Sequence, residues 1–184
     1  MAEDPHKARA NADCLYDAAE VDAAIDRLAA AITRDLAQSD PVVLVVMNGG
    51  LIPAGHLLTR LDFPLRLDYL HATRYRERTR GGGLHWLKRP TRPLRGETVL
   101  VIDDILDEGI TLAEIVADCR REAPERLLTA VLCHKRHDRH NGFRADYVGL
   151  EVEDRYVFGY GMDYKGYWRN APGIFALAED RTGE

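Results

Sequence analysis

Residues 98–121 read TVLVIDDILDEGITLAEIVADCRR, and this stretch decides the fold. It opens with an apolar run, Val99–Ile102, that stops at two adjacent acids, Asp103 and Asp104. A short turn follows, and apolar residues then recur at the spacing of one helix face. A buried strand, a loop and a helix in this order predict one unit of an open parallel sheet, in which ligands bind at the carboxyl ends of the strands.

The turn at residues 107–111 has the composition of an anion-binding loop. The first N–H groups of a helix have no partner within the helix, and they favour an anion. Gly109 lets the backbone approach that anion closely, and the hydroxyl of Thr111 adds a donor. No Gly-Lys-Ser/Thr sequence follows the glycine, so the stretch is not a P-loop.

The paired acids indicate what else that ligand contains. Carboxylates repel phosphate, but they accept hydrogen bonds from sugar hydroxyls and help to hold Mg²⁺. A ligand that places its phosphate on the turn and its hydroxyl groups against Asp103 and Asp104 has the chemistry of a ribose 5-phosphate. The alternative that stays open is a buried strand that ends in two solvated acids without a ligand.

The rest of the chain predicts an α/β fold with a mostly parallel central sheet. Asp17 and Glu20 form a capping box ahead of an amphipathic helix at 18–37. Val42–Met47 is a continuous apolar run, as in a strand buried on both faces. Further elements are expected as a helix at 53–61, strands at 65–71, 127–134 and 147–150, and short extended segments at 156–160 and 174–178.

Residues 74–97 are too long for a simple connection, and segments of this kind are usually lids or binding loops. We expect a mobile lid at about 74–92, with part of it in a hairpin where Leu84, Trp86 and Leu87 pack. Residues 71–92 contain seven Lys or Arg and only one acidic residue. This excess of positive charge favours either a solvated loop or attraction of an anionic substrate.

Composition limits the class of protein. A chain of 184 residues with 46% hydrophobic and 30% charged residues predicts one globular domain. The longest apolar run is too short to span a bilayer, and the polar N-terminus is no secretory signal, so we expect a cytoplasmic protein with no membrane partner. The net charge of −5 argues against general nucleic-acid binding, and three widely spaced cysteines give no zinc pattern.

Residues 98–121 resemble the phosphoribosyl pyrophosphate (PRPP) signature of the type I phosphoribosyltransferases. Met47–Gly50 resembles the pyrophosphate loop of the hypoxanthine-guanine branch, in which the peptide before the second residue is often cis, and residues 135–170 resemble the tail of that branch. The resemblance implies the type I phosphoribosyltransferase fold, a mostly parallel sheet flanked by helices. It further implies a single domain over residues 1–184, with its core at about 40–145 and a small hood built from the N-terminal segment and about 150–184.

The same resemblance implies a role for each site residue. Asp107 is implied as the general base near N7 of a purine, and Lys135 as the donor to its 6-oxo group. The resemblance implies that PRPP and its ribose phosphate bind Asp103, Asp104, Asp107, Glu108, Gly109, Ile110 and Thr111, and that pyrophosphate binds Asn48, Gly49, Tyr75 and Arg169. It implies that the purine binds Lys135, Tyr156, Val157 and Asp163. It implies that Mg²⁺ is held by Asp163, Asp103 and Asp104.

Two residues depart from the family pattern. Glu108 stands where Thr is usual, which removes a hydroxyl donor and adds a negative charge beside the phosphate. We expect Glu108 to turn outward and pair with an arginine, for which the basic loop at residues 71–92 is one source. Asn48 stands where Lys or Arg is frequent, so a charge contact to pyrophosphate is missing.

The resemblance implies a purine salvage enzyme that uses Mg²⁺ and transfers phosphoribosyl from PRPP to hypoxanthine or guanine, and that forms a homo-oligomer, a dimer or a tetramer. Two alternatives stay open. One is a transferase for xanthine or another base, although Lys135 and the tail at 156–163 argue against adenine and pyrimidines. The other is a non-catalytic PRPP- or nucleotide-binding regulator, although the chain shows no helix-turn-helix extension.

Overall fold

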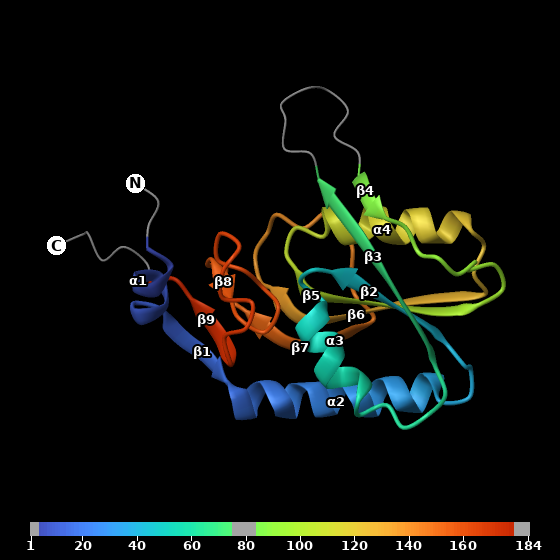
Figure 1. Cartoon of the computed structure of the whole chain (residues 1–184), viewed down its shortest axis with the longest axis horizontal. Coiled ribbons are helices and arrows are strands. Elements are labelled where there is room, and N and C mark those ends of the chain that lie inside the picture. The colour runs from blue at the N-terminus through green and yellow to red at the C-terminus, as the bar shows by residue number, and fades with distance from the viewer. Residues whose placement is uncertain (1–3, 75–83, 179–184) are drawn as a thin grey trace.

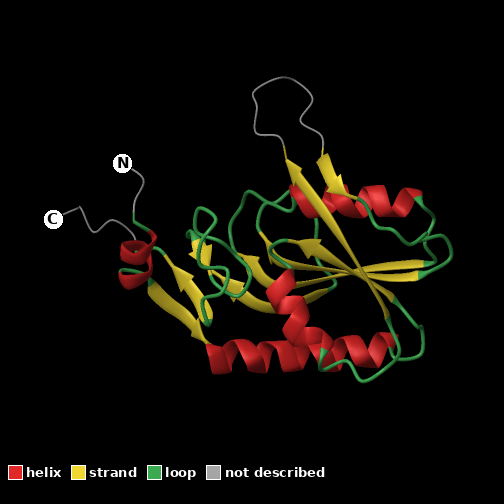
Figure 2. Ribbon diagram, viewed as in Figure 1, coloured by secondary structure: helices red, strands yellow, loops and turns green. Residues whose placement is uncertain are grey.

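A computed structural model describes residues 4–74 and 84–178, and two β-sheets lie within them (Figures 1 and 2). The larger sheet has the order β4-β3-β2-β5-β6-β7, with every pair parallel except β3 and β4. Its strands are β2 (Val42–Met47), β3 (Arg66–Arg74), β4 (Leu84–Lys88), β5 (Thr98–Leu106), β6 (Arg126–Lys135) and β7 (Tyr147–Val152). The predicted α/β fold with a mostly parallel sheet is confirmed.

Helices cover both faces of this sheet (Figure 2). α2 (Ala18–Leu36) and α3 (Leu51–Leu58) lie on one face, and α4 (Ile110–Arg121) lies on the other. Because side chains alternate along a strand, β2 and β5 supply both cores. The core under α2 takes Val43, Val45, Leu100 and Ile102, and the core under α4 takes Val42, Leu44, Val99 and Val101.

The first long helix begins as the sequence predicts. The carboxylate of Asp17 accepts the Glu20 N–H, and the Glu20 carboxylate accepts the Asp17 N–H, both at 2.9 Å. The apolar residues expected on one face of α2 are all buried there: Val21, Ile25, Leu28, Ile32 and Leu36.

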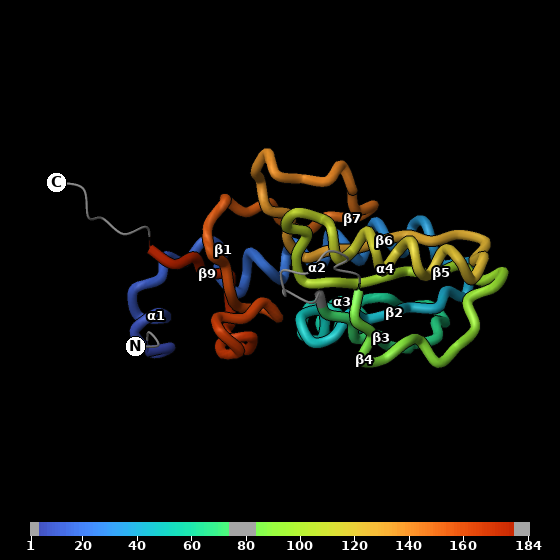
Figure 3. The backbone as a smooth tube through the Cα atoms, turned by 90° about the horizontal axis from the view of Figure 1, so that it is seen from above, coloured from blue at the N-terminus to red at the C-terminus, as the bar shows by residue number. Residues whose placement is uncertain are grey.

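A second, smaller sheet is antiparallel and has the order β1-β9-β8. It consists of β1 (Asp13–Asp17), β8 (Val157–Phe158) and β9 (Gly173–Ala176), with the short helix α1 (Pro5–Ala10) beside it. Figures 1 and 3 show these terminal segments together at the end toward which the parallel strands point. The sequence pattern predicted neither α1 nor β1.

Several expected boundaries were wrong. β5 does not stop at Asp103 but continues to Leu106, because it remains paired with β6. α3 begins at Leu51 rather than Pro53, since the first turn of a helix tolerates a proline. The predicted hairpin is confirmed as β3–β4, but Leu87 is 58% exposed and does not pack.

Residues 75–83, the tip of the expected lid, lie outside the described part of the chain. No helix among the described residues is both long and apolar enough to cross a lipid bilayer.

Replacing Asp17 with Ala removes the side chain that caps α2. We expect the free energy of unfolding to fall by about 1 kcal/mol and the Tm by roughly 3 °C. Thermal unfolding followed by circular dichroism measures both. Asp62→Ala, at an exposed position before β3, is the control and should change the Tm by less than about 1 °C. Equal losses in the two variants would contradict the capping role.

Candidate active site

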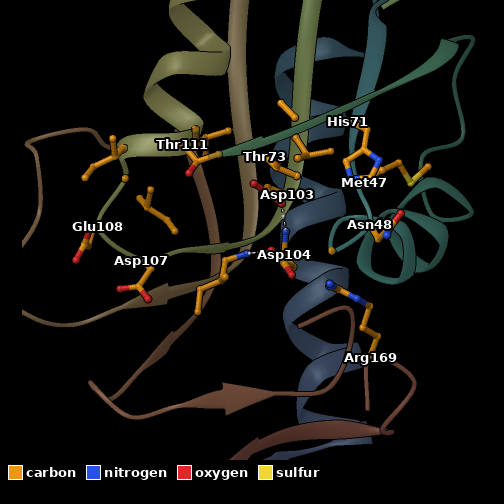
Figure 4. A pocket seen from close by; sticks show the side chains of 18 residues that line it. Met47, Asn48, His71, Thr73, Asp103, Asp104, Asp107, Glu108, Thr111 and Arg169 are labelled. Atoms are coloured by element: carbon orange, nitrogen blue, oxygen red, sulfur yellow. Dashed lines mark hydrogen bonds between the residues drawn. The ribbon is translucent and has the colours of Figure 1, made fainter. Parts of the chain in front are cut away.

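A cavity of about 910 Å³ opens at the carboxyl ends of β2, β3 and β5 (Figure 4). Its lining comes from residues 46–49, 71–73 and 103–112 and from Arg169, in the loop before β9. The structure brings together at this cavity ten residues that the sequence assigned to PRPP and pyrophosphate: Asn48, Gly49, Asp103, Asp104, Asp107, Glu108, Gly109, Ile110, Thr111 and Arg169. Ligands of parallel sheets bind at this edge.

The paired acids lie next to each other in the cavity wall. Asp103 Oδ1 accepts the Asp104 N–H at 2.9 Å, and Asp104 Oδ1 accepts the Ile105 N–H at 2.8 Å. Burial and the adjacent Asp104 carboxylate raise the pKa of Asp103 well above its usual range, and burial also raises the pKa of Asp104. The guanidinium of Arg169, which points toward Asp104 in Figure 4, opposes both shifts. Such a pair favours a ligand that supplies hydroxyl donors or a cation.

The turn between β5 and α4 exposes backbone N–H groups to the cavity. No side chain caps the start of α4, so the N–H groups of its first turn remain for an anion or water. Gly109 precedes the helix with φ at 82°, a conformation that favours glycine. A Cβ at this position would also lie 2.6 Å from Asn141 Oδ1. Anion binding at this turn stays a prediction, and the uncapped start of α4 is the feature that supports it.

The loop after β2 approaches the paired acids. The Met47–Asn48 peptide is cis, as the family resemblance implied. A Cβ on Gly49 would lie 2.1 Å from Asp104 Oδ2, so any larger residue at this position would have to displace that carboxylate. On its other side, the carbonyl oxygen of Gly49 lies 2.1 Å from where a Cβ of Gly161 would stand. The loop is thus enclosed between β5 and the segment that follows β8.

Asp107 contacts two buried basic side chains at the end of β6. Lys135 Nζ lies 2.7 Å from Asp107 Oδ2, and His137 Nε2 lies 2.7 Å from Asp107 Oδ1. Burial alone would raise the pKa of Asp107, but these two contacts outweigh it and lower that pKa below its usual value. The sequence did not predict His137, and its one available signal was the cluster of histidines at 134, 137 and 140.

Arg169 connects the cavity to the remaining predicted residues. Its Nη1 donates to the Gly161 carbonyl at 2.6 Å, and its Nη2 lies 2.6 Å from Asp163 Oδ1. The Tyr156 hydroxyl donates to the Asp163 carbonyl at 3.2 Å, and the Tyr156 residue is 48% exposed. Val157 is buried in the core, so its backbone alone is available to a ligand. The lining of the cavity does not include Lys135, Tyr156, Val157 or Asp163. Lys135 and Asp163 contact residues that do line it, namely Asp107 and Arg169.

Two expectations involve the basic loop. Tyr75 lies outside the described residues. Glu108 is exposed, and within residues 4–74 and 84–178 it forms no ion pair. Because the arginines at 76, 78 and 80 are not described, the expected pairing of Glu108 with that loop stays a prediction.

Comparison with known families identifies this arrangement. Residues 11–165 match the model of the phosphoribosyl transferase domain, which covers most of the chain. The chain belongs to the type I phosphoribosyltransferase family. The six-stranded sheet and the small sheet of terminal strands are the fold of this family.

Similar proteins carry names from the purine branch. The chain is 33% identical to the hypoxanthine-guanine-xanthine phosphoribosyltransferase of Tritrichomonas foetus, over 90% of this chain and 91% of that protein. It is 30% identical to the hypoxanthine-guanine phosphoribosyltransferase of Bacillus subtilis, over 89% and 91% of the two chains. A solved hypoxanthine phosphoribosyltransferase from Staphylococcus aureus superposes with a TM-score of 0.88 at 26% identity and covers 99% of this chain and all of its own.

Gly49→Ala should disrupt PRPP binding, because the added methyl group displaces the Asp104 carboxylate. We expect the PRPP Kd to rise about tenfold or more, which corresponds to at least ~1.4 kcal/mol. Isothermal titration calorimetry measures this Kd. Gly55→Ala in α3 is the matched control, since nothing lies within 4 Å of its added Cβ. A Kd for Gly49→Ala within twofold of the control would show that the loop yields without affecting the site.

Proposed function

We propose that the protein transfers phosphoribosyl from PRPP to hypoxanthine or guanine, with IMP or GMP and pyrophosphate as products. The observation that carries this proposal is the 2.7 Å contact of Lys135 Nζ with Asp107 Oδ2 beside the cavity. A cationic donor and an anionic acceptor side by side match the 6-oxo group and the N7 proton of a 6-oxopurine, which share one edge of the base. The names of the relatives support the same class of base.

PRPP fits the cavity by its chemistry. Its 5-phosphate would bind the N–H groups of residues 108–111, and its ribose hydroxyls would donate to Asp103 and Asp104. Its pyrophosphate would bind the loop at Asn48 and Gly49 and the guanidinium of Arg169, with Tyr75 as the covering residue. The purine would lie against the exposed ring of Tyr156 and bond to the backbone of Val157.

Mg²⁺ fits the paired acids. Magnesium in such sites usually keeps several waters and is held by one or two carboxylates together with substrate phosphates. Asp103 and Asp104 supply two carboxylates. Among the described residues, no group of three or more His, Cys, Asp or Glu forms a separate metal site. Both Asp163 oxygens already have partners, Arg169 and the Gly166 N–H, so Asp163 would reach the ion through water. When bound, Mg²⁺ neutralises the charge of the pyrophosphate leaving group.

The reaction would proceed by attack of purine N9 on C1 of the ribose as the bond from C1 to the pyrophosphate oxygen breaks. The purine must lose a proton, and Asp107 would accept it at N7. Lys135 would move from Asp107 to the 6-oxo group. Because Lys135 is one cause of the lowered pKa of Asp107, its departure makes Asp107 a stronger base when the purine is bound.

The direct test is the purified protein with PRPP, Mg²⁺ and a panel of bases, followed by ultraviolet absorbance. We expect turnover of hypoxanthine and guanine and little or none of adenine. Xanthine belongs in the panel, because the name of the Tritrichomonas foetus relative includes it. A protein that binds PRPP but turns over no base would instead be a regulator. We further propose a cytoplasmic homo-oligomer, a dimer or a tetramer, which analytical ultracentrifugation tests.

Asp107→Asn should lower kcat by about a hundredfold or more, because an amide cannot accept the purine proton. The PRPP Kd should stay within about threefold, since the backbone of the turn remains. Steady-state kinetics with hypoxanthine and calorimetry with PRPP measure the two effects. Asp138→Asn, an exposed aspartate of the loop after β6, is the matched control with the same change of charge. If Asp107→Asn kept half of the wild-type kcat, the general-base role would be wrong.

Lys135→Gln should weaken discrimination between bases, because a neutral amide offers both a donor and an acceptor to position 6 of the purine. The ratio of kcat/KM for hypoxanthine to that for adenine should fall about tenfold, which corresponds to ~1.4 kcal/mol. Arg136→Gln removes the neighbouring charge, which faces Glu151, and should leave this ratio unchanged. An unchanged ratio in Lys135→Gln removes Lys135 from base recognition.

A further inference from the structure

His137 is held as a hydrogen-bond donor to Asp107. Its Nε2 lies 2.7 Å from Asp107 Oδ1, and its side chain is 2% exposed. Its Nδ1 accepts the N–H of Arg139 at 3.1 Å. A nitrogen that accepts a hydrogen bond carries no proton, so the proton of the neutral ring must be on Nε2, where it faces the carboxylate.

The surroundings of His137 fix the orientation of its ring. The ring of His140 stacks on it with centroids 4.3 Å apart and planes 18° apart. Arg139, which provides the N–H for Nδ1, forms two 2.7 Å hydrogen bonds with the carboxylate of Asp154. These bonds hold Arg139 in place, and the N–H of Arg139 in turn sets the tautomer of His137.

The two donors to Asp107 occupy different oxygens. Lys135 binds Oδ2 and His137 binds Oδ1, while the Asp107 side chain remains 44% exposed toward solvent. In the proposed reaction Lys135 leaves Oδ2 for the 6-oxo group of the purine. His137, which is almost fully buried, has no comparable route to the base.

We infer that His137 is a positioning residue that keeps Asp107 oriented and ionised once Lys135 has moved to the purine. The inference rests on the proposed function. The hydrogen bond from Nε2 holds Oδ1 and stops the carboxylate from rotating, so that Oδ2 meets the N7 proton. It also stabilises the ionised carboxylate after its lysine partner has gone.

The test compares two substitutions at one position. His137→Leu removes the donor, and we expect kcat to fall by about ten- to a hundredfold, the range for a lost hydrogen bond to a charged group. The KM for hypoxanthine and the Kd for PRPP should change less than about threefold. His137→Gln places an amide N–H close to the position of Nε2 and should restore kcat to within about threefold of wild type. His134→Leu, in the same histidine cluster but without a contact to Asp107, is the control.

A readout that needs no turnover completes the test. Long-range ¹H–¹⁵N correlation spectra of the wild-type protein report the tautomer of each histidine, and His137 should carry its proton on Nε2. A proton on Nδ1, a kcat for His137→Leu within twofold of wild type, or equal losses in His137→Leu and His137→Gln would each overturn the inference. If His137→Leu fails to fold, His137→Gln and the tautomer decide. A wild-type protein without purine turnover refutes the proposed function instead, and the spectra then still decide whether His137 donates to Asp107.

Discussion

The site depends on two adjacent, half-buried carboxylates near the end of β5. Because β5 stays paired with β6 up to Leu106, the backbone holds Asp103 and Asp104 in the wall of the cavity. Burial raises the pKa of both groups, so the ionised pair is unfavourable until a ligand supplies hydroxyl donors or a cation. A sugar phosphate bound with Mg²⁺ would supply both hydroxyl donors and a cation to these two carboxylates.

The segments around the acids are fitted to them. Gly49 leaves space for the Asp104 carboxylate, and Gly161 leaves space for the carbonyl of Gly49. Arg169 connects the segment after β8 with the paired acids. It donates to the Gly161 carbonyl, and its positive charge opposes the raised pKa of both Asp103 and Asp104. The small sheet beyond the strand ends, visible in Figure 1, also packs in the core under α2 through Val157, Ile174 and Ala176.

The elements that the sequence predicted are those set by local residues. The capping box at Asp17 and the apolar run of β2 are signals that lie within a single segment, and both elements are as predicted. β1 could not be predicted, because it exists through pairing with β9 at the other end of the chain. His137 was missed for a related reason. Its contact with Asp107 depends on the register that places Leu106 opposite His134, which no pattern within one segment encodes.

The contact between Lys135 and Asp107 sets a condition on any base that binds there. The Lys135 side chain is 11% exposed, so separating it from its carboxylate without replacement would leave a largely buried charge unpaired, at a cost of about 3–5 kcal/mol. A 6-oxopurine supplies an acceptor for the ammonium and a proton for the carboxylate, and it therefore replaces both halves of the pair. Adenine presents an amino group to the ammonium and leaves Lys135 without an acceptor. On the proposed function, discrimination against adenine arises more from this unpaired charge than from attraction of the correct base, because leaving a buried charge without a partner is more unfavourable than a new hydrogen bond is favourable.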